Sequence, residues 1–179
     1  MTHGNCFVAV ALSFALTACG QPAEKAAPVE SAPELSFQPV ADGRLEVGEA
    51  TWLFEGPAAT ATQDGKTLIR LEGPTAIVRV FQTPVEAGKA YDLKVGVERT
   101  GGNAPAEVRA ILSRDCAVAA EDFSQQQTMV SPGQSANLTV THTFKRSYPC
   151  AKMVLHVVNA SAADPAVIAI TTADLAPQT

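Results

Sequence analysis

The stretch YDLKVGVE, residues 91–98, sets the fold that we expect for this chain. Tyr91 and every second residue after it are apolar, whereas the residues between them are charged or glycine. Successive side chains of a β-strand point to opposite faces, so a period of two gives one apolar and one polar face. The stretch therefore predicts a β-strand with one face against a core and the other in water.

Other strand-like segments lie on both sides of this one. They alternate in polarity or are rich in β-branched residues, and they cover 67–72, 75–82, 106–113, 138–144, 151–159 and 166–172. Turn-forming pairs such as Asp64-Gly65, Gly73-Pro74 and Pro132-Gly133 separate them. Many short strands between turns predict an all-β fold, an antiparallel β-sandwich of jelly-roll type, over residues 36–179.

Helical structure is expected at one place only in this region. No stretch after residue 36 keeps a helical period for three turns. One short helix is expected between Cys116 and Phe123, inside a long loop over residues 115–135.

Composition and charge narrow the function classes. The chain has 179 residues, of which 46 % are hydrophobic and 6 % aromatic, which is enough for one domain with a core. Its formal net charge is −5, and it contains no cluster of lysine and arginine. The sequence therefore argues against a nucleic-acid partner and against electrostatic attraction to an anionic membrane surface.

The N-terminus has the pattern of an export signal. Residues 1–18 contain no Lys, Arg, Asp or Glu, and the apolar block 6–18 is shorter than the roughly 20 residues that span a bilayer. Leu16-Thr17-Ala18-Cys19 resembles the lipobox of bacterial lipoproteins. The resemblance implies cleavage before Cys19, lipids on its sulfur and amine, and, because Gly20 follows, an outer-membrane location. The alternative is an ordinary signal peptide with a chance cysteine.

The segment after Cys19 is expected to be a tether. Residues 20–35 contain Pro22, Pro28 and Pro33 among alanine and glutamate, without apolar periodicity. Such a composition cannot pack a core and stays extended. The expected organisation is therefore a signal peptide over 1–18, a lipidated tether over 19–35 and a β-sandwich over 36–179.

The remaining cysteines are expected to form a disulfide. Cys6 would leave with the signal and Cys19 would carry lipid, which leaves Cys116 and Cys150 in an oxidising compartment. A bridge between them would close a loop of about 35 residues and contribute roughly 3 to 4 kcal/mol in the chain-entropy model. No histidine lies near either cysteine in sequence, so neither a metal nor any other cofactor is expected.

A family resemblance supports the sandwich. The run from Phe81 to Leu93, with Trp52, Thr143-Phe144 and the stretch 167–175, resembles carbohydrate-binding modules of the galactose-binding-like jelly-roll group. The resemblance implies that Trp52 and Tyr91 belong to the core. Thr171 and Thr172 stand where the family usually has an aspartate near a structural calcium, so the sequence does not predict calcium.

The resemblance also indicates candidate ligand residues. Tyr148, beside Cys150, is the best free ring for stacking against a sugar, and Phe123 in the long loop is another. Arg79, Arg109 and Lys94 are expected on outward strand faces, where they could form a polar groove or simply a solvated surface.

No catalytic group is expected. The alternation of its strand places His142 toward the core side or the sheet margin, so it is interpreted as a hydrogen-bonded structural histidine. Glu121-Asp122 is interpreted as a polar patch in a loop. Because no acid, base and nucleophile converge, the chain is not expected to be an enzyme. Two hypotheses remain: a lipid-anchored binding module for a glycan, or a structural or protein-interaction lipoprotein of the cell envelope.

Overall fold

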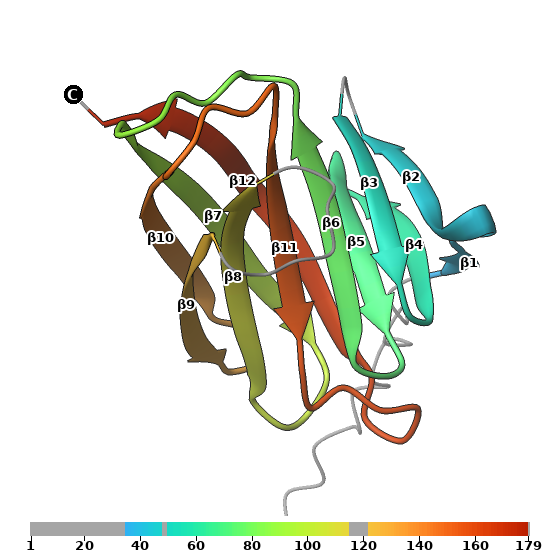
Figure 1. The fold of residues 1–179 in the computed structure, drawn as a ribbon. Coiled ribbons are helices and arrows are strands. Elements are labelled where there is room, and N and C mark those ends of the chain that lie inside the picture. The colour runs from blue at the N-terminus through green and yellow to red at the C-terminus, as the bar shows by residue number, and fades with distance from the viewer. Residues whose placement is uncertain (1–34, 48–49, 115–121, 179) are drawn as a thin grey trace, which may run out of the picture. The chain divides into compact units, whose positions relative to one another are not determined.

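A computed structural model of the chain describes residues 35–47, 50–114 and 122–178. The compact unit over Glu34–Thr179 is a sandwich of two antiparallel six-stranded sheets (Figure 1). The only helix among the described residues is the 3-10 turn η1, Ala41–Gly43. The expected all-β, antiparallel sandwich is confirmed. Within these residues no helix is long and apolar enough to cross a membrane.

The strands divide evenly between the layers. Sheet A has the order β1 (Gln38–Pro39), β4 (Ala58–Gln63), β5 (Lys66–Leu71), β12 (Ala166–Pro177), β7 (Ala90–Gly101), β10 (Ser135–Thr143). Sheet B has the order β2 (Arg44–Val47), β3 (Ala50–Glu55), β6 (Thr75–Phe81), β11 (Ala151–Val157), β8 (Ala106–Arg114), β9 (Phe123–Val130).

The stretch over residues 91–98 lies in β7, between β10 and β12. Its apolar side chains point inward as expected, and Tyr91, Leu93, Val95 and Val97 are all at most 3 % exposed. Inward residues of β8 and β11, among them Leu112 and Leu155, meet them from sheet B. Trp52 and Tyr91 both belong to this core, which confirms the implication of the family resemblance.

The structure corrects the expected loop over 115–135. Phe123–Val130 is β9, which pairs with β8 along its whole length. Phe123 therefore begins an edge strand. The short helix expected between Cys116 and Phe123 falls largely on residues 115–121, which lie outside the described residues, as do the signal peptide, Cys19 and most of the tether.

Cys150 is buried directly before β11. Its neighbour Ala151 pairs with Arg114, the last residue of β8. Cys116 follows Arg114 by two positions in the sequence but lies outside the described residues. The Cys116–Cys150 disulfide therefore stays a prediction. It is compatible with the register of β8 and β11, because Cys116 is two positions from Arg114 and two residues at that separation are at most about 7 Å apart.

A buried arginine, Arg99, connects strands of the two sheets at one end of the sandwich. Arg99 is 2 % exposed, and its side chain donates hydrogen bonds to the carbonyl oxygens of Gly101, at 2.9 Å, and Val130, at 3.4 Å. Burial lowers the pKa of its guanidinium, although Asp164 nearby opposes that effect. Arg99 thus connects the end of β7 with the end of β9 across the two layers.

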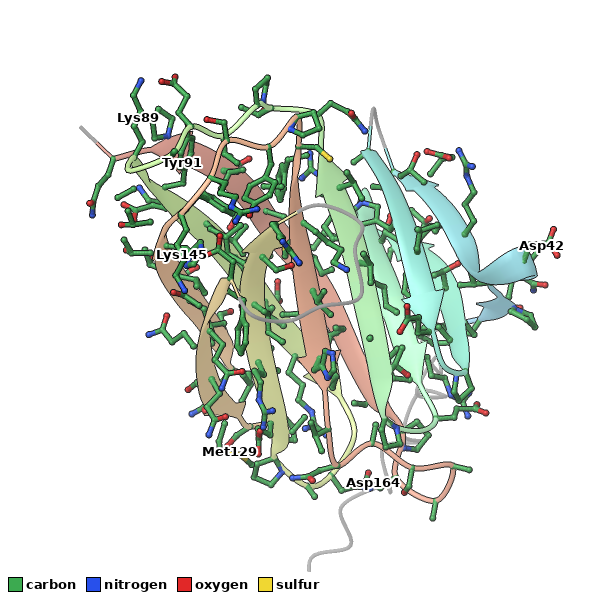
Figure 2. The ribbon with its side chains drawn as sticks, viewed as in Figure 1. Asp42, Lys89, Tyr91, Met129, Lys145 and Asp164 are labelled. Atoms are coloured by element: carbon green, nitrogen blue, oxygen red, sulfur yellow. The ribbon has the colours of Figure 1, made fainter. Side chains whose placement is uncertain are left out.

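Asp164 caps the turn between β7 and β8 at the same end of the sandwich (Figure 2). Its carboxylate accepts hydrogen bonds from the backbone N–H groups of Ala104, at 2.9 Å, and Asn103, at 2.8 Å. These backbone hydrogen bonds, that of Ala104 first, lower the pKa of Asp164. The carboxylate is therefore stabilised in its charged form.

This capping predicts a pH dependence of stability. Because the folded-state pKa lies below the unfolded value, Asp164 stabilises the fold fully above the unfolded pKa, near 4. The contribution is lost as the pH falls through the lower folded pKa. Urea unfolding of Asp164→Asn between pH 7 and pH 2 should show a smaller acid-induced loss than the native chain. Equal losses in both proteins would contradict the capping role.

Candidate functional site

The outer face of sheet B carries a row of apolar side chains across four strands. The strand register aligns Ile111 of β8, Val154 of β11, Val78 of β6 and Leu53 of β3. Their sequence neighbours Leu112, Met153, Ile77 and Phe54 point into the core, so these four point outward. We call Ile111, Val154, Val78 and Leu53 the apolar row.

The rows on both sides of the apolar row contain polar residues, together with Phe123 on β9 and with Ala76 and Val80 on β6. One neighbouring row contains Gln127, Arg109 and His156, on β9, β8 and β11. The row on the other side contains Phe123, Ser113 and Lys152, on the same three strands. Gln125 of β9 lies at the end of the apolar row itself. The face thus combines a central apolar surface with hydrogen-bonding groups at its borders.

Large apolar side chains are exposed chiefly on this sheet. The five in the described residues are Leu35, Val47, Leu53, Phe123 and Met129. Leu53, Phe123 and Met129 point outward from sheet B and are 42 %, 41 % and 53 % exposed. Met129 lies at the far end of β9 (Figure 2). Exposed apolar groups gathered on one face are typical of a binding surface.

Several polar groups of this face have no partner among the described residues. Within the described residues, the side chains of Lys152, Gln125, Gln127 and His156 form no hydrogen bond or ion pair, whereas Arg109 and Glu107 form an ion pair of 2.8 Å. Side-chain amide, ammonium and imidazole groups can bond to hydroxyls of a ligand. The sheet B face therefore offers both apolar contact and unused hydrogen-bonding capacity.

The outer face of sheet A differs from it in both respects. Most of its side chains are threonine, charged or small residues, together with Val167 and the buried Leu68, and several of the polar ones bond to one another. Asp92 accepts a hydrogen bond of 2.6 Å from Thr141, and Lys66 and Glu98 form an ion pair of 2.7 Å. No large apolar side chain is exposed on these strands among the described residues. A solvated outer surface accounts for this face.

The structure separates the three basic candidates. Arg109 points outward from sheet B, and Lys94 points outward from sheet A on the opposite side of the sandwich. Arg79 pairs with the buried Met153 and points inward, so the expectation that it lies on an outward face is wrong. Its side chain crosses to β12, where it donates to the carbonyl oxygen of Ala173. These three residues do not form one groove.

Tyr148 is not the free ring that the sequence suggested. Its ring packs against the core, edge-to-face with Phe144 at 6.0 Å between centroids, and Arg114 lies 5.9 Å above it. Its backbone forms an isolated bridge with Val85. A ring held in this way can add only an edge to a binding surface.

A buried polar network closes the edge between β9 and β10. His142 is hydrogen-bonded on both ring nitrogens, at 3.0 Å to Ser124 and 3.0 Å to Asp122, which confirms its structural interpretation. Asp122 is 6 % exposed, so its interpretation as a polar patch in a loop is wrong. Its other carboxylate oxygen accepts from the Lys145 backbone N–H and the Tyr148 hydroxyl; Lys145 itself follows β10 (Figure 2).

Ser124, His142 and Asp122 have the composition of a catalytic triad, but their position is that of a structural network that holds neighbouring segments together. Asp122 and His142 are buried, and each hydrogen bond of Asp122 joins segments that belong to different layers or loops. Such a position suits a role in stability, because Asp122 and His142 are only 6 % and 8 % exposed. No group of three or more His, Cys, Asp or Glu side chains in the described part of the chain is placed to hold a metal ion.

Sequence reasoning missed the apolar row. A signal was present, because segments 75–80 and 152–157 have apolar residues at both odd and even positions. Strands with two apolar faces are unusual in a sandwich with solvated outer faces. That Ile111 and Leu53 belong to the same row could be recognised only once the register of the strands was known.

Comparisons with known proteins agree with the fold. No protein-family model and no curated protein matches the chain. A solved structure described as "CBM4 structure and function" is similar with a TM-score of 0.56 at 12 % identity, over 72 % of this chain and 87 % of that one. This likeness supports the β-sandwich fold.

Two further structures are more distant. The N-terminal cellulose-binding domain of a Cellulomonas fimi β-1,4-glucanase has a TM-score of 0.48 at 17 % identity, over 72 % of this chain and 89 % of that one. TmCBM61 in complex with β-1,4-galactotriose has a TM-score of 0.46 at 10 % identity, over 71 % and 88 %.

Proposed function

We propose that the protein is a non-catalytic binding module and that a saccharide binds on the outer face of sheet B. The observation that carries this proposal is the apolar row with unused polar groups on either side. The C–H face of a pyranose is apolar, and its edge carries hydroxyls. The row would contact the ring, and Gln125, Gln127 and His156 would bond to the hydroxyls.

The affinity is expected to be modest. Phe123 is the one aromatic side chain that points outward from sheet B in the described residues, so stacking is limited to one end of the face. Aliphatic contact contributes about 25 cal/mol per Å² of buried apolar area, part of which offsets the cost of association. Dissociation constants in the micromolar to millimolar range would fit such a surface.

Isothermal titration of the full chain with β-1,4-galactotriose and with cellotetraose tests the proposal. Binding of either sugar with a stoichiometry of one is the expected result. Absence of heat with both sugars, and with oligosaccharides released from peptidoglycan, would contradict it.

The outward-pointing apolar row, in which Leu53 is exposed and Val78 is buried, also supports a second candidate, a protein-interaction module of the envelope. Leu53 and Met129 are aliphatic, and aliphatic patches suit a protein partner as well as a sugar. A protein ligand would bury the whole row and give affinity in the absence of any glycan. Binding of a sugar to this face that no protein partner competes with would favour the first candidate.

The lipid anchor belongs to the same proposal. Cys19, preceded by an apolar segment and followed by a proline-bearing tether, would carry the acyl chains that hold the module at the outer membrane. Intact mass spectrometry of the native protein should give a chain that begins at Cys19 and carries diacylglycerol. An unmodified chain that retains Met1 would contradict the anchor.

A further inference from the structure

The ladder between β3 and β6 is short, and a hollow opens where it ends. The two strands pair only from Leu53–Val78 to Glu55–Ala76. Beyond this point a hollow of about 370 Å³ lies between them. Its described lining comes from the two strands and the segment after β6: Ala50, Thr51, Leu53, Arg79, Val80, Phe81, Gln82 and Thr83. Its volume lies within the usual range of small-molecule sites.

Arg79 is the one charged residue among the described residues that line this hollow. Its guanidinium carbon lies 4.7 Å from the ring centre of Phe81 and 5.4 Å from that of Trp52. The hydrogen bond from Nη1 to the Ala173 carbonyl oxygen fixes its orientation. Aromatic faces and this one bond thus hold the guanidinium in place and leave further N–H groups for a ligand.

Arg79 has no carboxylate partner among the described residues, although the chain carries a net charge of −5. Among the described residues, the acidic group associated with the rim is Glu46, which already bonds to Arg44 at 2.7 Å and to the Thr51 hydroxyl at 2.8 Å. Lys152 lies on the strand beside Val80 and also has no ion-pair partner among the described residues. Within the part of the chain that the structure describes, the positive charge of Arg79 and Lys152 is therefore not matched by a carboxylate.

The hollow is continuous with the proposed saccharide site. Leu53 belongs both to the apolar row and to the lining of the hollow, and Val80 lies next to Val78 on the same face. A saccharide laid along the apolar row would therefore place its end residue at the hollow beside Leu53, which Arg79 lines from the inner side of β6. Arginine binds carboxylates through two parallel N–H···O bonds, a geometry that a neutral hydroxyl cannot match.

We propose that this hollow is a subsite for the carboxylate of an acidic sugar residue, so that the preferred ligand is a uronic-acid-containing saccharide. The inference rests on the proposed function, because it places the acidic residue at the end of a sugar chain already bound on the sheet B face. Arg79 would bind the carboxylate, Lys152 would add to the local positive potential, and Thr51 and Gln82 would border the ring.

The test compares two trisaccharides that differ chiefly in charge. The full chain is titrated calorimetrically with β-1,4-linked mannuronate trimer and with β-1,4-mannotriose at low salt. We expect the acidic trimer to bind at least tenfold more tightly. Arg79→Gln, which keeps a donor for the Ala173 carbonyl, should remove this advantage and leave the affinity for mannotriose within twofold. Lys94→Gln, on the opposite face, should change neither value.

The outcomes separate this inference from the proposed function. Equal affinity for the two trimers, or an advantage that survives in Arg79→Gln, would overturn the acidic subsite alone. Absence of binding to both trimers would overturn the saccharide site and the subsite with it. Triglutamate binding as tight as mannuronate binding, and lost in Arg79→Gln, would overturn the sugar class. Thermal unfolding of Arg79→Gln and of Arg79→Lys checks the fold, and Arg79→Lys should retain part of the preference.

Discussion

Replacing Asp122 by alanine should lower the free energy of unfolding by about 3 kcal/mol and the Tm by about 10 °C. The carboxylate is 6 % exposed and accepts hydrogen bonds from the His142 ring, the Lys145 backbone and the Tyr148 hydroxyl. Removing it leaves the buried His142 ring and the part-buried Lys145 N–H and Tyr148 hydroxyl without this acceptor, and an orphaned buried polar group costs about 1 to 3 kcal/mol.

Two further variants grade this effect. Ser124→Ala removes one hydroxyl that bonds to His142 and should cost only about 1 kcal/mol. Asp92→Ala is the matched control, because that aspartate also bonds to a side chain, Thr141, but on the outer face of sheet A. It should cost at most about 1 kcal/mol, since water replaces the lost partner. Urea unfolding that gives equal losses of unfolding free energy for Asp122→Ala and Asp92→Ala would contradict the stabilising role of the buried network.

The second large effect concerns binding. Replacing Val154 by glutamate should weaken saccharide binding at least a hundredfold, or about 2.8 kcal/mol. Val154 lies at the middle of the apolar row, between Ile111 and Val78. A carboxylate there would have to lose its hydration against the apolar face of the sugar, and the nearest basic side chains, Lys152 and Arg109, lie in the neighbouring rows rather than in its own.

Controls locate the effect on one face. Val154→Thr keeps the β-branched shape and should weaken binding by less than tenfold. Lys94→Glu changes the charge by two units at the middle of sheet A and should leave the sugar affinity unchanged. Unfolding curves establish that Val154→Glu is folded at the titration temperature. A hundredfold loss in Lys94→Glu, or none in folded Val154→Glu, would place the site elsewhere.

The strands that the sequence predicted are those with clear alternation or dense β-branching. β7 and β10 each have one apolar and one polar face, and their parities were therefore readable. β9 was missed because it is an edge strand whose sequence, FSQQQTMV, is mostly polar. β4 was missed because alanine and threonine give little contrast between its two faces.

The site was less predictable than the fold because it depends on register. Arg79 shares parity with Ile77 and Phe81, both buried, but Val78 and Val80 are apolar too, so parity alone did not show its direction. The network of Asp122 and His142 joins strands of different sheets, and nothing in the sequence shows that β9 and β10 meet at one edge. A sequence pattern shows to which face of its strand a side chain points, whereas a site depends on which strands lie next to one another.

The same reasoning explains why the aromatic inventory was misleading. A search for rings identified Tyr148, which the structure uses to pack on Phe144 and to bond with Asp122. The surface that we propose as the ligand site is built instead from aliphatic side chains contributed by four strands. Only the pairing of those strands brings these side chains into one row.

The most direct test of the saccharide site is a methyl NMR titration of the full chain, labelled at isoleucine, leucine and valine, with the tightest-binding oligosaccharide. The account predicts shifts for Ile111, Val154 and Leu53 on the sheet B face and none for Val167 on the sheet A face. Shifts confined to Val167 and its neighbours, or no methyl shift at saturating sugar, would contradict it.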